Sequence, residues 1–352
     1  MFASLFAAAL IVSQSAEVSF DGPARVREAV AAVRAVALAP AEVDWDALET
    51  ELTRDARTAN DTADMLPIYV RLLDALGDHH SFVQADQELL ETYQTRAGRA
   101  LYEGRPRRAL TSAFIGREAI EGRDLPLASG RSVRLVVTPQ MPGGGPIVRQ
   151  RAAALFAAVV DDHEQTCGYV VDLRGNQGGN VWPMLVGLSA LLGDGPQGVE
   201  RDGAGRDLAY ARLEQGAAIV LEGEYAGMAA ARAENWRPVP GLTAAPVAVL
   251  IDDAVASSGE GVAVAFRGRS ATRYFGQATF GVASSNTGVT LSDGVNLVVT
   301  TGMMVDRDGR VWPDGLSPDE VVEHGPGDPS NPEDAVVEAA TAWLAVQPGC
   351  AA

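Results

Sequence analysis

The hydrophobic pattern divides the chain into a helical amino-terminal part and a longer part in which strands and helices alternate. From Pro23 to about Gly98, apolar residues recur with the helical period in "PARVREAVAAVRAVA", "WDALETELTRDA" and "MLPIYVRLLDALG". The first stretch begins with proline at a favourable first-turn position, and the last ends at a glycine. We therefore predict a small helical domain over residues 23–98.

Beyond residue 98 the pattern becomes that of an α/β protein. "LPLASGRSVRLVVTPQ" predicts a hairpin within an otherwise irregular stretch from Leu101 to Gly145. After it, "GYVVDL", "PVAVLIDD" and "ATRYFG" are typical of buried strands, while "PIVRQRAAALFAAVVDDH", "WPMLVGLSALLG" and "GEGVAVAFRGR" are typical of helices. This alternation predicts a sheet with helices packed on it over residues 99–352. Residues 203–245 are expected to form an insertion or a long strand pair, and "DPSNPEDAVVEAATAWLA" a closing helix.

The first sixteen residues, "MFASLFAAALIVSQSA", form an apolar run that ends in small side chains. The run is too short to span a bilayer and has the form of a secretory signal, although only the free amino terminus supplies positive charge. We predict that residues 1–16 are a signal peptide and that the protein is periplasmic or secreted; a soluble amino-terminal helix is the alternative. No later segment is long and apolar enough to be a membrane span.

Composition excludes several kinds of chemistry and partner. The 28 basic and 46 acidic residues give a net charge of -18, which repels phosphate backbones, so we expect no nucleic-acid partner. All basic residues are arginine, and without lysine a lysine base is excluded. The two cysteines and four histidines show no zinc-site spacing, so no metal or organic cofactor is expected. Cys167 is interpreted as a small buried hydrophobe, and whether it meets Cys350 stays open.

Two loops that follow predicted strands carry residues suited to acyl chemistry. In "VVDLRGNQGGNVWPML", Gly178 and Gly179 lead into a helix, where backbone amides donate hydrogen bonds to developing negative charge. In "DDAVASSGEG", Ser257 would end a strand and Ser258 would begin a helix, so the Ser258 amide can point to the same space as a Gly178 or Gly179 amide. Together these amides would form an oxyanion hole beside a serine nucleophile. The simpler alternatives are a tight turn for the glycines and a helix cap for the serines.

A serine nucleophile needs a base with a pKa near neutral, and apart from carboxylates this chain offers only histidine. "LGDHHSFV" follows a predicted helix and contains two of the four histidines. His80, followed by Ser81, is the candidate base. A surface histidine without function is the alternative.

These stretches together resemble a known family. "DLRGNQGG", "AVASSGEGVAVAFRGR" with "FGQATFG" behind it, and "DGRVWPDGLSPDEVV" resemble the catalytic domain of tail-specific, or C-terminal processing, serine peptidases. The "WDAL…LLDALGDHHS" arrangement resembles the branch related to the tricorn protease core. The resemblance covers the chain from about Trp45 to Val322. It implies a crotonase/ClpP-like α/β catalytic domain preceded by a small helical domain, and a protein or peptide substrate.

The resemblance also implies roles for single residues. Ser257 takes the place of the nucleophile, Glu260 that of a supporting glutamate, and Asp172 and Arg174 belong to the strand-end motif. Many members use a lysine that follows "TFG", but here that position is Val282, so the Ser/Lys dyad is absent.

The tricorn-like branch instead uses a histidine base helped by a serine and a carboxylate, an arrangement that His80 and Ser81 fit. Its orienting glutamate has no clear match. Asp314 in "WPDG" is the nearest carboxylate, although an ordinary turn aspartate is equally consistent with that position. No PDZ domain is recognisable between the two parts of the chain, so the resemblance does not establish recognition of a protein's C-terminal tail.

We therefore expect an exported serine endopeptidase. Two other functions stay open at this point. One is a catalytically inactive family member that binds an apolar ligand or peptide in the same cleft, since a fold does not fix function. The other is an acyl-CoA enzyme of the crotonase type, which fits the architecture but leaves "ASSGE" without a role.

Overall fold

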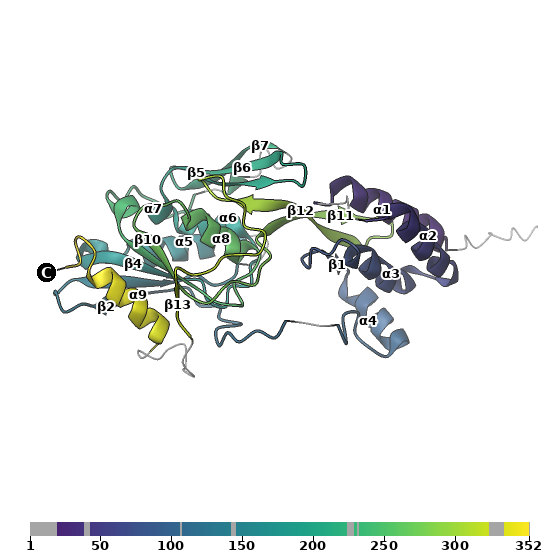
Figure 1. Ribbon diagram of the computed structural model, residues 1–352, viewed down its shortest axis with the longest axis horizontal. Helices are drawn as coiled ribbons and strands as arrows, with labels where there is room; N and C mark the ends of the chain where they lie inside the picture. The colour runs from purple at the N-terminus through teal and green to yellow at the C-terminus, as the bar shows by residue number, and fades with distance from the viewer. Residues whose placement is uncertain are drawn as a thin grey trace, which may run out of the picture.

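The structure is a computed structural model that describes residues 20–38, 43–105, 108–141, 146–223, 229–230, 232–323 and 334–351. Figure 1 shows an elongated molecule with helices at one end and a mixed α/β part at the other. The predicted signal peptide, residues 1–16, lies outside the described residues. Within the described ranges, no helix has both the length and the apolar character needed to cross a membrane.

The amino-terminal part is helical, as predicted. Each of the four α-helices among its described residues begins after an aspartate whose side chain accepts a hydrogen bond from a first-turn amide. The short strand β1 (Phe82–Gln84) lies between the third helix and the fourth. The helices are α1 (Gly22–Val36), α2 (Trp45–Asp55), α3 (Thr62–Asp74) and α4 (Gln87–Ala97), with a 3-10 turn η2 (Ala56–Thr58).

The second part contains a six-stranded sheet in the order β13-β10-β9-β4-β3-β2. The predicted hairpin forms its antiparallel edge, and all the other pairs are parallel. The predicted α/β alternation is thus confirmed. The strands are β2 (Glu121–Pro126), β3 (Ser132–Val137), β4 (Thr166–Asp172), β9 (Val247–Ile251), β10 (Thr272–Gly276) and β13 (Glu320–Val321).

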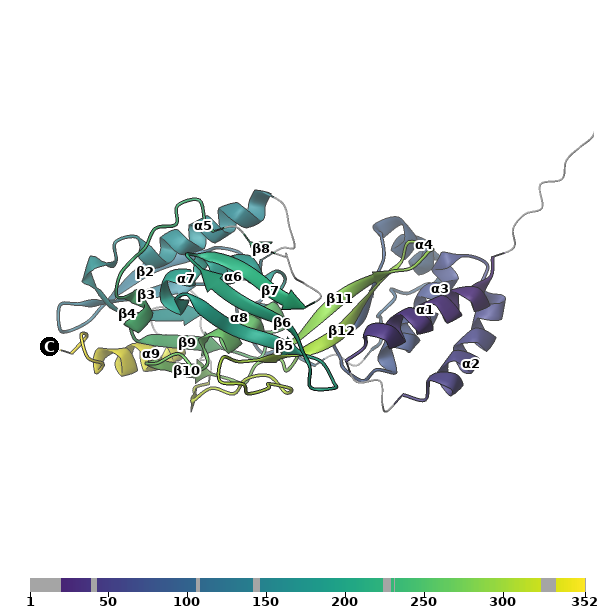
Figure 2. The same ribbon diagram turned by 90° about the horizontal axis from the view of Figure 1, so that it is seen from above.

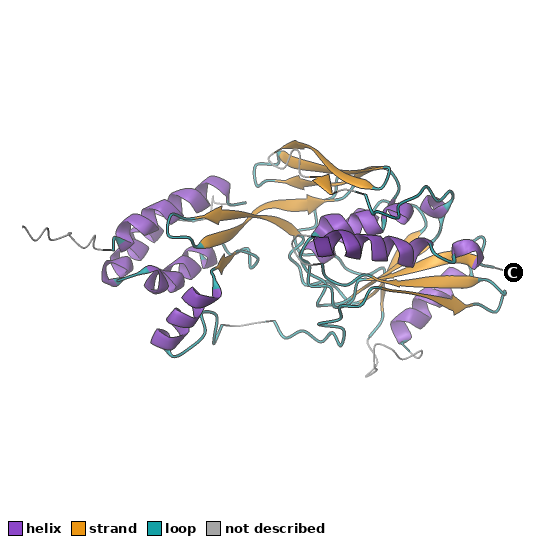
Figure 3. Cartoon of the chain, turned by 180° about the vertical axis from the view of Figure 1, so that it is seen from behind, coloured by secondary structure: helices purple, strands orange, loops and turns teal. Residues whose placement is uncertain are grey.

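Helices cover both faces of this sheet: α5, α6 and α8 lie on one face and α9 lies on the other (Figures 1 and 3). The stretch predicted as one helix, "WPMLVGLSALLG", forms two helices that are interrupted at Leu188. The helices are α5 (Pro146–Val160), α6 (Val181–Gly187), α7 (Ser189–Leu192), α8 (Ser258–Phe266) and α9 (Ala335–Ala345), with 3-10 turns η3 (His163–Gln165) and η4 (Leu242–Ala244).

A second sheet joins the two parts of the molecule. Its order is β1-β12-β5-β6-β7-β8, and β11 pairs with β12. The antiparallel pair β6–β7 lies in the stretch 203–245, where the sequence predicts an insertion or a strand pair. The strands are β5 (Gly195–Arg201), β6 (Asp207–Glu214), β7 (Ala217–Gly223), β8 (Ala229–Ala230), β11 (Ser284–Thr290) and β12 (Asn296–Val305).

The β11–β12 hairpin leaves the α/β part and extends beside the amino-terminal helices (Figure 2). Its buried residues Leu291, Val295 and Leu297 belong to the same hydrophobic core as the helices. At the tip, the Tyr69 hydroxyl of α3 donates to Asp293 Oδ2 over 2.7 Å. The hairpin therefore completes the core of the helical part and fixes β1 beside β12, where Val83 pairs with Leu297.

The parallel pairing of β4 with β9 brings the two candidate loops together. Asp172 at the end of β4 is opposite Leu250 near the end of β9. In parallel sheets, ligands bind at the carboxyl ends of the strands. The "GNQGG" and "AVASSGE" stretches follow these two ends, so they lie at the same edge of the sheet.

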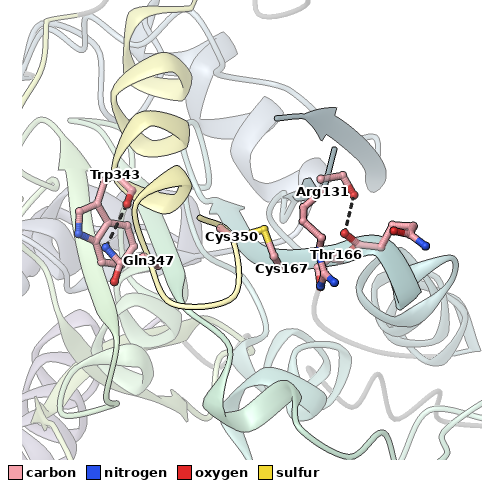
Figure 4. The surroundings of a disulfide bond; sticks show 8 residues. Arg131, Thr166, Cys167, Trp343, Gln347 and Cys350 are labelled. Carbon is pink, nitrogen blue, oxygen red and sulfur yellow. Dashed lines mark hydrogen bonds between the residues drawn. A yellow bond between two sulfur atoms is a disulfide. The ribbon is translucent and has the colours of Figure 1, made fainter. Parts of the chain in front are cut away.

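The cysteines form a disulfide. Cys167 in β4 is bonded to Cys350, which follows α9, across 183 positions of sequence (Figure 4). The interpretation of Cys167 as a small buried hydrophobe was therefore incomplete, because this buried side chain is also a covalent link between the sheet and the last helix. The sequence left this pairing open because the two positions meet only in the folded chain.

Candidate active site

Ser257 occupies a strained turn between β9 and α8. Its φ of 53° and ψ of -122° lie in a region that non-glycine residues rarely adopt. A strained strand-to-helix turn is the arrangement that exposes a nucleophilic serine in other hydrolases. The next residue, Ser258, begins α8, so its backbone amide has no acceptor within the helix.

The buried Glu260 carboxylate holds this turn in place. Its Oε2 accepts hydrogen bonds from the Ser257 amide at 3.0 Å and the Val282 amide at 2.9 Å. Its Oε1 accepts from the Thr279 hydroxyl at 2.5 Å and the Gly281 amide at 2.9 Å. Burial raises the pKa of this carboxyl, while the four hydrogen bonds act in the opposite direction. Glu260 thus joins the Ser257 turn to the loop after β10.

The two glycines of the neighbouring loop differ in their hydrogen bonds. Gly178 has a φ of +106°, and a Cβ there would lie 2.9 Å from the Ser257 Cβ, so only glycine fits. Its N–H donates to Asn176 Oδ1 over 2.9 Å. The carbonyl of Gly179 accepts from the Ser258 hydroxyl at 2.8 Å, but no described hydrogen bond uses the Gly179 N–H. Of the two predicted donors, Gly179 is thus the one whose amide is available.

His80 is held by a turn before β1. The Asp78 carboxylate accepts from the His80 amide at 2.9 Å, and the side chain of Asn286 donates to the His80 carbonyl at 3.3 Å. The ring Nδ1 lies 2.7 Å from the Ser284 hydroxyl, 204 positions away in the chain. Burial lowers the pKa of the imidazole to about 4, although Asp78 acts to raise it. The ring is therefore neutral at physiological pH and can accept a proton.

A cleft of about 720 Å³ brings the candidates together. Among the described residues, no direct hydrogen bond joins His80 to Ser257, and such contacts are often loose in unliganded sites. Apolar side chains such as Phe82, Trp182 and Met304 also face the cleft. Its polar lining includes His80, Gly179, Ser257, Ser258, Ser284, Asn286 and the carboxylate residue Glu200.

The structure places two predicted helpers of the histidine away from its ring. The Ser81 hydroxyl donates to Asp78 Oδ2 over 2.7 Å and accepts from the Thr300 amide at 2.9 Å, so it stabilises the turn. The hydroxyl that contacts the ring belongs to Ser284, which the sequence analysis missed. Asp314 is exposed and is not among the residues that line the cleft.

Asp172 and Arg174 form a buried ion-pair network rather than a lining of the cleft. Arg174 Nη2 lies 2.9 Å from Asp172 Oδ2, and Arg117 Nη1 lies 3.0 Å from the same oxygen. Burial acts to raise the pKa of Asp172, but the two guanidinium groups outweigh it and hold that pKa below its usual range. Arg174 also pairs with Asp334, the cap of α9, at 2.7 Å. In the part of the chain that the structure describes, no group of three or more acidic, histidine or cysteine side chains could hold a metal ion.

Comparisons with known proteins identify the family and the fold. The profile of peptidase family S41 matches residues 139–322, which is more than half of the chain. The chain is 26% identical to the Nisin-resistance protein of Lactococcus lactis subsp. lactis over 277 residues, covering 78% of this chain and 76% of that protein.

Solved structures with the same fold have low sequence identity to this chain. A lipoprotein from Streptococcus agalactiae superposes with a TM-score of 0.66 at 18% identity, covering 93% of this chain and 97% of that one. A putative peptidase from Parabacteroides merdae gives a TM-score of 0.57 at 16% identity, covering 95% and 100% of the two chains. The photosystem II D1 C-terminal processing protease gives 0.55 at 16% identity, covering 86% and 94%. The predicted family resemblance and the α/β fold with amino-terminal helices are thus confirmed, while the crotonase/ClpP-like classification stays a prediction.

Proposed function

Because the chain belongs to peptidase family S41 and is therefore a serine-type peptidase, we propose that it cleaves peptide bonds with Ser257 as nucleophile and His80 as general base. The observation that carries this proposal is the shared cleft, which contains a neutral imidazole, a hydroxyl on a strained turn, and two amides suited to an oxyanion.

In the proposed reaction, His80 Nε2 takes the proton from Ser257 Oγ as this oxygen bonds to the carbonyl carbon of the substrate. The Ser284 hydroxyl at Nδ1 orients the ring so that Nε2 is the nitrogen available for transfer. The developing oxyanion accepts hydrogen bonds from the amides of Ser258 and Gly179. The imidazolium then gives its proton to the leaving amine as the C–N bond breaks, and water, deprotonated by His80, releases the acyl group.

We further propose that the two parts of the chain supply different groups to the reaction. Residues 23–98 supply the base, and residues 99–352, with the insertion 203–245, supply the nucleophile and the oxyanion hole. Glu260 acts as a positioning residue, since its carboxylate holds the Ser257 amide.

Export is also part of the proposal. It is supported by the apolar run in residues 1–16 and by the Cys167–Cys350 disulfide, because disulfides persist mainly in oxidising compartments. A mature protein that begins after residue 16 is the expected result of amino-terminal sequencing. Retention of the intact amino terminus in the cytoplasm would contradict export.

A fluorophosphonate probe tests the chemistry, because it labels only an activated serine. We expect labelling of the wild type at Ser257, and loss of both labelling and hydrolysis of an unfolded protein in Ser257→Ala. His80→Gln should lower both rates at least about a hundredfold, whereas the control His163→Gln should not, since that ring contacts only the Val160 carbonyl in the hydrogen bonds described. Nisin is a second compound to test for hydrolysis, because the Lactococcus relative is named for resistance to it. Undiminished hydrolysis by Ser257→Ala would end the proposal, and a wild type without labelling would favour a binding protein.

A further inference from the structure

The segment that joins the helical part to the first strand of the second part lies against the carboxyl ends of the parallel strands. We call residues 108–117 the linker segment. Arg108 Nη1 donates to the Phe280 carbonyl over 2.7 Å, and its guanidinium lies over the Phe280 ring. The amide and the hydroxyl of Thr111 both donate to Asp253 Oδ2, over 2.6 and 2.8 Å. The linker segment is therefore bound to the loops that surround the cleft.

A single carboxylate, that of Asp252, connects this segment to both catalytic loops. The Ser112 hydroxyl donates a hydrogen bond to Asp252 Oδ2. Asp252 Oδ1 accepts from the Gly175 amide and from the Ala254 amide, each over 3.1 Å. Gly175 begins the loop that leads to the glycine pair, and Ala254 begins the turn that leads to the nucleophile. The Asp252 side chain is fully buried, and the three groups that donate to it all belong to the protein.

The linker backbone also packs closely on the glycine loop. A Cβ at Gly175 would lie 2.3 Å from the Phe114 carbonyl oxygen, so this contact excludes every side chain. The Phe114 ring is buried and lies under the Arg174 guanidinium, 4.1 Å from ring centroid to Cζ. This close contact therefore fixes the position of the glycine loop against the linker segment.

We propose that Ser112 and Asp252 are positioning residues for the reaction. By binding the linker segment, Asp252 fixes the glycine loop relative to the nucleophile turn, and so sets the separation between the Gly179 and Ser258 amides. The two residues act through other groups, because neither lines the cleft. This inference rests on the proposed function, since it concerns the geometry of the oxyanion hole.

Ser112→Ala is the test variant, because it removes one hydroxyl and leaves the Asp252 carboxylate in place. Ser112→Thr keeps the hydroxyl and should restore the wild-type behaviour. Ser132→Ala is the control: it also removes one serine hydroxyl, from a buried residue, and this hydroxyl donates to the Gln165 carbonyl at the opposite end of the sheet. Each variant is measured for the rate of fluorophosphonate labelling, for kcat and KM separately, and for Tm.

We expect Ser112→Ala to lower kcat and the labelling rate by about ten- to hundredfold, because misplaced oxyanion donors stabilise the transition state poorly. KM should change by less than about threefold, because the substrate cleft itself is intact. A purely structural role would lower Tm and leave the labelling rate of the folded protein unchanged, and that result would overturn the inference. So would an equal loss in Ser132→Ala, or no recovery in Ser112→Thr.

Amide hydrogen exchange separates failure of this inference from failure of the proposed function, since it needs no activity. Peptides containing Gly175 and Ala254 should exchange faster in Ser112→Ala than in the wild type or in Ser132→Ala. Unchanged exchange there would overturn the inference even if Ser257 proves to be the nucleophile. Faster exchange in Ser112→Ala, combined with a wild type that the probe does not label, would support the coupling while rejecting the peptidase mechanism.

Discussion

The turn that holds Ser257 and the turn that holds His80 are built in different ways. Ser257 is held by Glu260, three positions away, and by a loop from the neighbouring strand of the same sheet. His80 meets Ser284 across 204 positions, at the boundary between the helices and the β11–β12 hairpin. One half of the site is thus internal to the α/β part, whereas the other depends on how the two parts are assembled. Damage to the helical part should therefore displace His80, the proposed base, while leaving the Ser257 turn folded.

The largest effect on stability and labelling is expected from Glu260→Ala, which disrupts the half of the site that lies within the α/β part. The change leaves four donors without their acceptor, including the Ser257 amide. A buried donor left without an acceptor costs about 1–3 kcal/mol of unfolding free energy. We expect a matching decrease in stability in denaturant titrations, with probe labelling lowered at least about a hundredfold.

Glu260→Gln is the control for that change, because its amide keeps one oxygen acceptor and nearly the same shape. It should retain more stability and more labelling than Glu260→Ala. Wild-type labelling in the alanine variant would show that the turn does not depend on this carboxylate.

A smaller effect is expected from Leu297→Ala, which disrupts the half of the site that depends on the assembly of the two parts. Leu297 is fully buried in the core that the hairpin shares with the helices. A cavity there should lower the unfolding free energy by about 2–5 kcal/mol. Hydrogen exchange should accelerate in α1, α3 and β1, while the strands of the six-stranded sheet keep their protection.

Leu135→Ala, in the core between the sheet and α9, is the matched control. It should accelerate hydrogen exchange in the six-stranded sheet while the amino-terminal helices keep their protection. If Leu297→Ala accelerated exchange equally in both parts, the molecule would be a single cooperative unit and the comparison would fail.

The smallest effect at neutral pH comes from the titration of His80. Because burial lowers its pKa from 6.5 to about 4, the ring stays neutral and able to accept a proton down to mildly acidic pH. The acid limb of kcat/KM should therefore lie near pH 4 rather than near 6.5. The same shift contributes stability that is present above pH 6.5 and is lost as the pH falls through 4.

The measurement is kcat/KM across the acid range, with circular dichroism at each pH to confirm that the protein is folded. Glu260→Gln should show the same acid limb as the wild type. This result would assign the limb to the His80 imidazole and exclude the buried Glu260 carboxyl, whose pKa is raised by burial. A limb near 6.5 would mean that the ring is solvated in the active form.

The sequence was most informative where chemistry depends on neighbours in the chain. A buried strand, a Gly-rich or Ser-rich turn and a helix appear in order around Gly178 and around Ser257, so the pairing of two parallel strands suffices to bring the loops together. Glu260 was expected because the motif places it three positions after the serine. The absence of lysine directed attention to His80.

What the sequence did not reveal depends on contacts between distant segments. Ser284 stands at the start of an ordinary strand, and only the hairpin's path into the helical part brings it to the imidazole. Ser81 was chosen because it adjoins His80, but adjacent residues in this turn point to different partners. The link between Cys167 and Cys350 depends in the same way on where α9 packs.

The hairpin that completes the helical core also sets an order of events during synthesis. The amino-terminal helices leave the ribosome first, but Val295 and Leu297, which close their core, follow only after most of the sheet has been made. The growing chain therefore carries His80 for most of translation without the strand that fixes it, so under the proposed mechanism peptide-cleaving ability arises only when the polypeptide is nearly complete.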